Sequence, residues 1–389
     1  MRRNIRLLYW HNFLTCFRFQ QAYTAIFFSQ ILGSYTAGMM ILAIENVSSA
    51  ILDIPTGIMS DKIGRTKTIA LGSLCMTLGV ACYAAAHAAA LLALGAVLCG
   101  CSSCLFNGNN TAMLYETLQF DQSEGHFHHF HGKTGSMTQL ALGVSAICSC
   151  FMTPYGLRLI FIAGIIPQML ATGVSFGFVD PPRRSNQRHE TLLHLREALA
   201  QIKGNPKLLL VMIGQAFSFG AGEASFHFRN VFISQLWPMW ALGIYRSVNN
   251  AGGVLGFWFS GKLIDRLKAP FLLVISEAFW TVTHVIAALI ANVFSPAIFM
   301  TGCLFYGLSV VATDKLMQDE FTDAQRATMG SVATFVGSIL YAITALVIGA
   351  VSDHFGVARA VLFGVLFGSL GLPAYWLVFR PRKKLAVQP

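Results

Sequence analysis

Long apolar stretches, separated by short polar segments, make up most of the chain. The stretches are about 20 residues long, the length at which an α-helix crosses the hydrocarbon core of a bilayer. Most of them have no polar face, which a helix on the surface of a large soluble protein would need. We therefore predict an all-α membrane protein with twelve transmembrane helices. Their expected ranges are 6–28, 37–58, 68–88, 91–115, 134–153, 157–179, 207–231, 239–261, 270–291, 296–315, 328–350 and 356–379.

The longest polar segment, residues 181–206, follows the sixth predicted helix. It opens with two consecutive prolines, which end a helix, and its charged stretch over 192–202 predicts an amphipathic helix on the membrane surface. The segment divides the chain into three parts. We expect an N-terminal six-helix bundle over 1–180, a cytoplasmic central loop over 181–206, and a C-terminal six-helix bundle over 207–389.

A turn with a high density of charge follows the second predicted helix. It reads Gly57-Ile-Met-Ser-Asp61-Lys62-Ile-Gly64-Arg65-Thr-Lys67. A fainter copy at an offset of 204 residues reads Gly261-Lys-Leu-Ile-Asp265-Arg266-Leu-Lys268. Before the last helix of each half, Tyr155-Gly156-Leu-Arg158 is loosely echoed by Phe355-Gly356-Val-Ala-Arg359. Repeats at half the chain length indicate two pseudo-symmetric halves.

The distribution of Lys and Arg predicts the orientation in the membrane. With the N-terminus inside, 22 of these residues fall in inside segments, whereas the outside segments hold Arg158, Arg229 and Arg359. The positive-inside rule then predicts that both termini are cytoplasmic. The expected location is the cytoplasmic (inner) membrane. This rule, together with anionic lipid at that face, accounts for the net charge of +10, so we expect no nucleic-acid partner.

Six plus six predicted helices, the central basic loop and the first charged turn together resemble the major facilitator superfamily. The turn matches its signature between helices 2 and 3 as Gly57-xxx-Asp61-Lys62-x-Gly64-Arg65. The stretches Met113-Leu-Tyr-Glu116 and Arg326-Ala-Thr-x-x-Ser331 are similar to those of a bacterial branch of this superfamily. The resemblance covers essentially the whole chain and implies a central cavity between two bundles. It says little about the substrate.

The resemblance also implies a conformational latch. In the family, the Asp of the motif lies against the N-terminus of helix 11, where free backbone N–H groups favour an anion. The motif Arg would pair with an acid at the inner end of helix 4, and Glu116 is the candidate here. These contacts hold the halves together when the cavity faces outward. The implied latch residues are Gly57, Asp61, Gly64, Arg65, Glu116, Asp265 and Arg266. In the second copy, Lys268 and Ala269 stand where Gly64 and Arg65 would be.

Four ionisable residues, Arg18, Glu45, Glu223 and Arg246, fall near the middle of predicted helices and at one level of the membrane. A lone charge in hydrocarbon costs several kcal/mol. These residues therefore either face a watery cavity that takes a solute and protons, or form two structural ion pairs, Arg18 with Glu45 and Glu223 with Arg246. Uncharged or weakly basic residues extend the candidate solute site. They are Gln21, Asn107, Asn110, His227, Asn249 and Asn250.

Cysteines and histidines raise the question of a metal. Cys99, Cys101 and Cys104 lie in the fourth predicted helix, and four histidines fall in the loop over 126–131. Thiols within membrane helices are usually small apolar fillers, and the two groups are expected on opposite sides of the bilayer. We therefore expect no metal and no cofactor. The sequence also has no Walker-type phosphate loop and no enzyme constellation.

We interpret the chain as a secondary active transporter that moves a small polar or amphipathic solute by alternating access. We expect coupling to protons, with Glu223 as the protonated group, and efflux rather than uptake. Two alternatives stay open: uptake of a small zwitterion or organic acid, and a non-transporting membrane sensor with the same fold. Glu277 receives no role, because the family places helix 9 at the periphery. The expected partners are the solute, protons and the lipid bilayer, and the expected state is a monomer.

Overall fold

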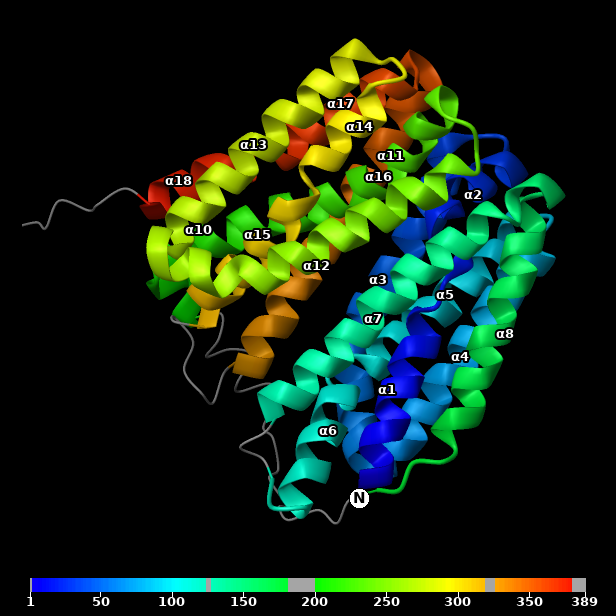
Figure 1. Cartoon of the computed structure of the whole chain (residues 1–389), viewed down its shortest axis with the longest axis vertical. Helices are drawn as coiled ribbons and strands as arrows, with labels where there is room; N and C mark the ends of the chain where they lie inside the picture. The colour runs from blue at the N-terminus through cyan, green and yellow to red at the C-terminus, as the bar shows by residue number, and fades with distance from the viewer. Residues whose placement is uncertain (1, 124–126, 181–199, 319–325, 380–389) are drawn as a thin grey trace, which may run out of the picture.

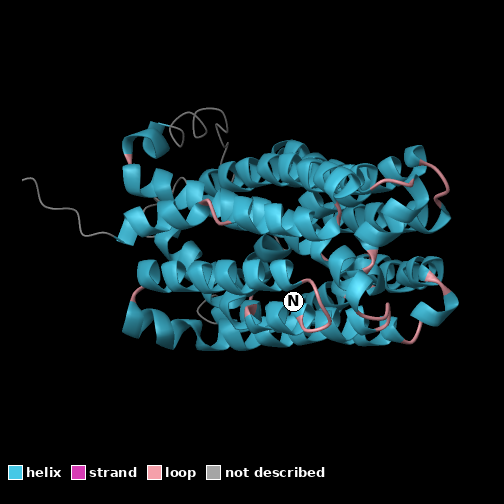
Figure 2. Ribbon diagram, turned by 90° about the horizontal axis from the view of Figure 1, so that it is seen from above, coloured by secondary structure: helices cyan, strands magenta, loops and turns pink. Residues whose placement is uncertain are grey.

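The structure is a computed structural model that describes residues 2–123, 127–180, 200–318 and 326–379. Within these ranges every regular element is helical (Figure 2). The elements of the N-terminal half are α1 (Arg2–Cys16), η1 (Phe19–Ala22), α2 (Thr24–Leu32), α3 (Tyr35–Ile63), α4 (Arg65–Ala85), α5 (Ala89–Phe106), α6 (Asn109–Phe120), α7 (Phe127–Cys150), η3 (Thr153–Tyr155) and α8 (Leu157–Ser175). Those of the C-terminal half are α10 (Pro206–Gln215), η4 (Ala216–Ala221), α11 (Gly222–Leu236), α12 (Ala241–Leu267), α13 (Ala269–Ile290), α14 (Ser295–Thr301), α15 (Cys303–Gln318), α16 (Arg326–Phe355), α17 (Val357–Gly368) and α18 (Gly371–Phe379).

The all-helical membrane architecture predicted from the sequence is confirmed. Within the described ranges, nine helical stretches are long and apolar enough to cross a membrane. The first, fifth and eighth predicted spans correspond to α1 with α2, to α7 and to α12, which carry more polar residues. The count of twelve spans therefore stays a prediction. The predicted surface helix over 192–202 lies almost entirely outside the described residues.

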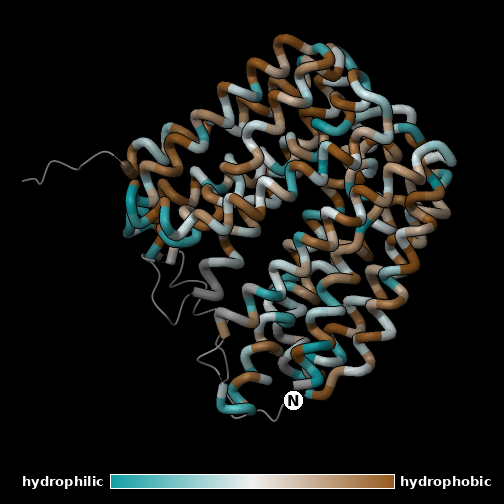
Figure 3. Tube along the Cα trace, in the orientation of Figure 1, coloured by the Kyte–Doolittle hydropathy of each residue, from teal (hydrophilic) through white to brown (hydrophobic). Residues whose placement is uncertain are grey.

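Many large apolar residues of both bundles are exposed. Hydrophobic residues occur along the Cα trace throughout both bundles (Figure 3). Ile166 and Leu170 of α8 are 61% and 55% exposed, Trp258 of α12 is 77% exposed, and Leu289 of α13 is 66% exposed. A soluble monomer rarely exposes so much contiguous apolar surface. Contact with lipid tails explains it, because hydrocarbon removes the cost of leaving these side chains unburied by protein.

Five of the long helices are interrupted within the bundle. The first breaks at Arg18, between α1 and η1, where the backbone is extended. The fourth breaks at Gly108, whose φ is 73°, between α5 and α6. The tenth predicted span breaks at Gly302 and the twelfth at Ser369. The seventh contains the π-helical segment η4, which ends two residues before Glu223. Each interruption frees backbone groups that must find partners inside the protein.

The most extensive contacts between the halves are those of α3 with α16 and of α7 with α12. Asp353 in the last turn of α16 accepts hydrogen bonds from the first turn of α3, and the Ser247 hydroxyl of α12 donates to the Gly143 carbonyl of α7 at 3.0 Å. The halves meet where α2 and α17 lie and diverge toward α6 and α18 (Figure 1). We call the first of these the Asp353 end and the other the Arg65 end.

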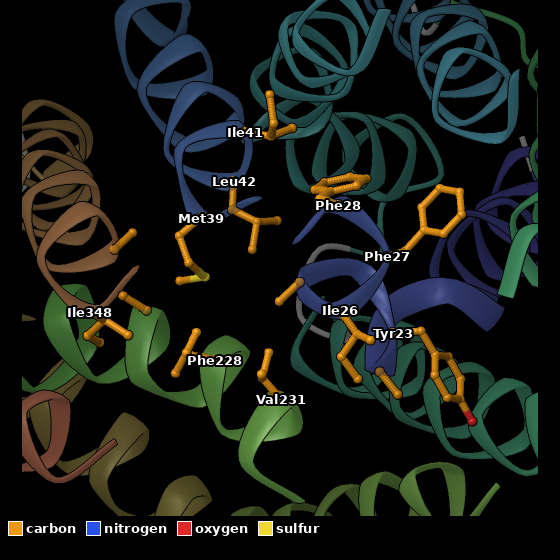
Figure 4. Close-up of a cluster of buried hydrophobic side chains, with 14 of the residues drawn as sticks. Tyr23, Ile26, Phe27, Phe28, Met39, Ile41, Leu42, Phe228, Val231 and Ile348 are labelled. Carbon is orange, nitrogen blue, oxygen red and sulfur yellow. The ribbon is translucent and has the colours of Figure 1, made fainter. Parts of the chain in front are cut away.

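A buried apolar cluster fills the junction of the halves (Figure 4). It combines Tyr23 and Phe28 of the first helix and Met39 of α3 with Phe228 of α11 and Ile348 of α16. All five of these side chains are 0% exposed. The burial of apolar surface from both halves stabilises their contact near the Asp353 end.

One backbone corner occurs four times, once before the third helix of each group of three. Gly64, Gly156, Lys268 and Gly356 have φ of 103°, 96°, 64° and 89°, and ψ of 152°, 151°, 142° and 160°. The repeated geometry agrees with the internal duplication that the sequence indicates. Lys268 is the exception in sequence, because a side chain rarely adopts this backbone conformation.

Replacing Lys268 by glycine is expected to stabilise the protein by about 1 kcal/mol. Relief of the backbone strain, about 1–3 kcal/mol, outweighs the flexibility that glycine adds to the unfolded chain. The midpoint of thermal unfolding of the purified protein measures the effect. The reciprocal control is Gly156→Ala, which should lower the midpoint, since nothing lies within 4 Å of the added Cβ and only φ is strained. A Lys268→Gly variant less stable than the wild type contradicts the prediction.

Candidate functional site

A cavity of about 210 Å³ lies within the C-terminal half, where it borders the N-terminal half. Helices α11, α12, α13 and α15 provide most of its wall, and Gln21 of η1 and Gln139 and Leu142 of α7 close it from the other half. The polar and aromatic lining residues of the C-terminal half are Ser218, Phe219, Glu223, Phe226, Arg229, Asn249, Asn250, Ser276, Glu277, Trp280, His284, Phe299, Phe305, Tyr306 and Ser309. A cavity with this mixed lining can hold a small polar solute together with water.

Arg229 is the cation in the cavity wall, and neighbouring side chains fix its position. It is 2% exposed, and its Nη1 lies 2.7 Å from Nε2 of His284. Its guanidinium also lies 5.0 Å from the ring centre of Phe299 and 5.4 Å from that of Trp280. Because Arg229 can only donate, His284 must accept through a neutral Nε2. His284 therefore does not neutralise the charge of Arg229. Cation–π contacts with the aromatic rings stabilise this charge instead.

The assignment of Arg229 to an outside segment was wrong. The residue lies in the middle of α11, six positions after Glu223, and is buried. The error arose because the seventh helix was expected to end at 231, whereas α11 continues to Leu236. Removing Arg229 from the outside count strengthens the asymmetry of positive charge on which the predicted orientation depends.

Glu277 was the residue without a role, and the structure places it in the cavity wall. It is 9% exposed and has Ser218 as its polar neighbour. The expectation that helix 9 would be peripheral is wrong here, because α13 carries Glu277, Trp280 and His284 on one face. Their spacing of three and seven residues is the signal that sequence reasoning missed.

Neither of the ion pairs considered from the sequence forms among these described residues. The Arg18 Nε donates to the Thr15 carbonyl at 3.0 Å, whereas Glu45 accepts a hydrogen bond from the Tyr83 hydroxyl at 2.9 Å. The Arg246 guanidinium lies 4.0 Å from the ring centre of Phe226, and its Nη2 has no hydrogen-bond partner.

Four predicted solute-site residues line the cavity: Gln21, Glu223, Asn249 and Asn250. The others, Arg18, Glu45, Asn107, Asn110, His227 and Arg246, do not. Asn107 instead donates to Asp53 Oδ1 at 3.0 Å, and the Ser331 hydroxyl of α16 donates to Asp53 Oδ2 at 3.1 Å. Asn107 thus supports a contact between the halves.

The contacts that the structure describes for Arg65 lie within the N-terminal half. Its Nε is 3.3 Å from Glu116 Oε1, and its Nη1 donates to Asn109 Oδ1 at 2.8 Å and to Ser60 Oγ at 3.0 Å. Gly64 forms the corner before Arg65, and Asp180 caps the helix that follows through the Thr66 N–H at 3.0 Å.

The remaining latch residues are not engaged with the other half where the structure describes them. No atom lies within 4 Å of a Cβ built on Gly57. Asp265 and Arg266 border a shallow groove of the C-terminal half. The side chain of Asp61, and with it the expected contact to the start of helix 11, lies outside the described residues.

The described residues contain no group of three His, Cys, Asp or Glu side chains suited to a metal. Cys99 and Cys104 are buried and Cys101 is half-buried, and all three are free thiols. His126 of the histidine-rich loop lies outside the described residues.

Apolar helices long enough to cross a membrane, and a partly polar cavity in the C-terminal half at its border with the N-terminal half, are features of a membrane transporter. The chain belongs to the Major Facilitator Superfamily, since the model of that family matches residues 10–340. A search of the curated proteins finds no match.

Solved structures share the fold at low sequence identity. A mutant of the nucleoside transporter NupG has a TM-score of 0.82 and 13% identity, covering 97% of this chain and 100% of that one. A POT family transporter in complex with 5-aminolevulinic acid has a TM-score of 0.74 and 12% identity, covering 97% and 95%. A bacterial homolog of the human lysosomal transporter Spinster, inward-facing and unoccupied, has a TM-score of 0.73 and 15% identity, covering 96% and 95%.

Replacing His284 by leucine is expected to destabilise the protein by about 1–3 kcal/mol, because a buried guanidinium loses its nearest acceptor. The Tyr245 hydroxyl, at 3.5 Å from Nη1, is the more distant one. Thermal unfolding of the purified protein measures the loss. His284→Gln is the matched control, since its amide oxygen can still accept from Arg229. Equal stability of the leucine variant and the wild type would show that the hydrogen bond contributes nothing.

Proposed function

We propose that this transporter moves a small zwitterionic or otherwise polar solute by alternating access and couples the movement to protons. The observation that carries the proposal is the presence of two carboxylates, Glu223 and Glu277, and one cation, Arg229, in the wall of a single cavity. A solute with an amino group and a carboxylate matches this set of charges. The 5-aminolevulinic acid bound to the POT family transporter is a molecule of that kind.

Arg229 is the proposed partner of a carboxylate on the solute. Its Nη1 already contacts His284, but its Nε has no hydrogen-bond partner. An arginine presents several N–H groups in one plane, which suits bidentate binding of a carboxylate. The aromatic rings around Arg229 remove water from it and thereby strengthen its attraction for an anion.

Glu223 is the proposed proton carrier. It lies in the first turn of α11, directly after the π-helical segment, and borders the cavity at the junction of the halves. Arg246 and Arg229 are its electrostatic neighbours, although neither forms a salt bridge with it among the described contacts. Glu223 lies near two arginines and borders the space for the solute. Its carboxylate can therefore take up or release a proton when the solute binds or when an arginine moves.

In this proposal the described conformation is the inward-facing state of the transporter. The positive-inside rule assigns the Arg65 end to the cytoplasm, and this is the end at which the halves diverge (Figure 1). At the Asp353 end, α3 and α16 are in contact and the apolar cluster is continuous. A solute would then leave or enter the cavity from the cytoplasm.

Proteoliposomes with a trapped pH dye test the coupling. A panel that includes 5-aminolevulinic acid and uridine is added with and without a pH gradient, and solute flux and proton flux are followed in both directions. Glu223→Gln is expected to abolish gradient-driven flux while exchange of labelled for unlabelled solute persists. Asp121→Asn, on an exposed residue, is the control. Gradient-driven flux that survives in Glu223→Gln refutes the coupling role, and the sign of the flux separates export from uptake.

Arg229→Gln is expected to raise the KM for a transported carboxylic acid by about 10-fold or more, because a charged hydrogen bond contributes about 1.5–3 kcal/mol. The KM for the methyl ester of the same solute should change little. The comparison of acid with ester is the control, since a general loss of folding lowers transport of both. An equal effect on both solutes contradicts the assignment of Arg229 to the carboxylate.

A further inference from the structure

The motif of the first charged turn has a second full-length match that lies at the opposite end of the molecule. Gly57-Ile-Met-Ser-Asp61-Lys-Ile-Gly64 matches Gly349-Ala-Val-Ser-Asp353-His-Phe-Gly356 at all four positions of the pattern Gly-x-x-Ser-Asp-x-x-Gly. Both segments form the last two turns of a long helix, α3 and α16, and end at the repeated corner. This match is closer than the one over 261–268, which lacks the serine and the final glycine.

Asp353 joins the two halves by four hydrogen bonds. Its carboxylate accepts from the backbone N–H of Tyr35 at 2.8 Å and of Thr36 at 2.9 Å. It also accepts from the hydroxyls of Ser34 at 2.6 Å and Thr36 at 2.7 Å. The N-terminus of α3 has free N–H groups and a positive dipole end, so an acidic side chain from the other half stabilises it.

Gly349 lets the two helices approach closely enough for this contact. A Cβ at position 349 would lie 2.5 Å from the Cα of Thr36 and 2.8 Å from its nitrogen. Any side chain there would therefore push the first turn of α3 away. Gly349 and Asp353 act on the same turn, one by close approach and the other by hydrogen bonding.

Gly57, which matches Gly349 in the first charged turn, makes no such close approach to a described helix of the other half. Gly57 is exposed, and none of the described residues lies within 4 Å of a Cβ built on it. Among the described hydrogen bonds between α3 and α16, the one nearest the Arg65 end is that of Ser331 with Asp53. One copy of the motif is thus engaged with the other half, and the glycine of the other copy is free.

We propose that residues 349–356 form a second latch, which holds the Asp353 end closed in this conformation. The latch opens when the halves rock to close the Arg65 end. The two copies would then act alternately: α16 caps the start of α3 in one state, and α3 approaches the start of α16 in the other. The bistable element is the α3–α16 pair, whose two ends cannot be closed together.

Hydrogen–deuterium exchange of the full-length protein in lipid nanodiscs tests this proposal without any solute, so its failure would not bear on the proposed coupling. Peptides that cover residues 34–40 report the Asp353 end, and peptides that cover 54–63 report the Arg65 end. Asp353→Asn is expected to speed exchange over 34–40 by about 10-fold, because charged hydrogen bonds are lost. It should slow exchange over 54–63, because the population shifts to the other state.

Two glycine variants provide a reciprocal pair. Gly349→Val should shift exchange in the same directions as Asp353→Asn, whereas Gly57→Val should shift both reporters in the opposite directions. His354→Gln, an exposed neighbour of Asp353, is the matched control and should leave both reporters unchanged. If Gly349→Val does not fold, the exchange rates of Asp353→Asn and Gly57→Val still test the latch proposal.

Faster exchange over 34–40 without slower exchange over 54–63 would show that Asp353 is only a local helix cap, and the latch would be refuted. No change at either end in Asp353→Asn refutes it equally.

Discussion

The close packing of α3 against α16 is the constraint on which the rest of the structure depends. At the Asp353 end the two backbones meet where Gly349 faces Thr36, and the carboxylate of Asp353 completes the first turn of α3. Since these helices belong to different halves, their contact sets the angle between the bundles. The halves diverge from this contact toward the Arg65 end (Figure 1), and α12 lies beside α7 as a second contact between them.

The repeated corner shows how far geometry can persist when residues change. The backbone at Gly64, Gly156, Lys268 and Gly356 is nearly the same, although one position has lost its glycine. The acid before the corner is present in three of the four turns, as Asp61, Asp265 and Asp353. At Asp353 this acid lies against the N-terminus of a helix of the opposite half. The scaffold therefore carries four similar turns and uses them differently.

Much of the fold could be predicted from the sequence, because apolar length and positive charge report directly on the bilayer. The Arg65–Glu116 contact was also anticipated, from the motif. The cavity was only partly predicted. Arg229 was missed because a charge close to a predicted helix end is easily assigned to the loop. Glu277 was noticed but not placed, since periodicity shows which residues share a face and not which neighbour that face meets. The breaks at Arg18 and Gly302 depend on tertiary contacts that a single sequence does not reveal.

The position of the cavity has a thermodynamic consequence. Nearly all of its wall belongs to the C-terminal half, and the N-terminal half contributes Gln21, Gln139 and Leu142. A bound molecule can shift a conformational equilibrium only by the difference in its affinity for the two states. Most of its contacts move with the half that holds it, so that difference is small. A molecule bound in the cavity would then leave both conformations populated. Its few contacts with the N-terminal half would determine how far it shifts the equilibrium between them.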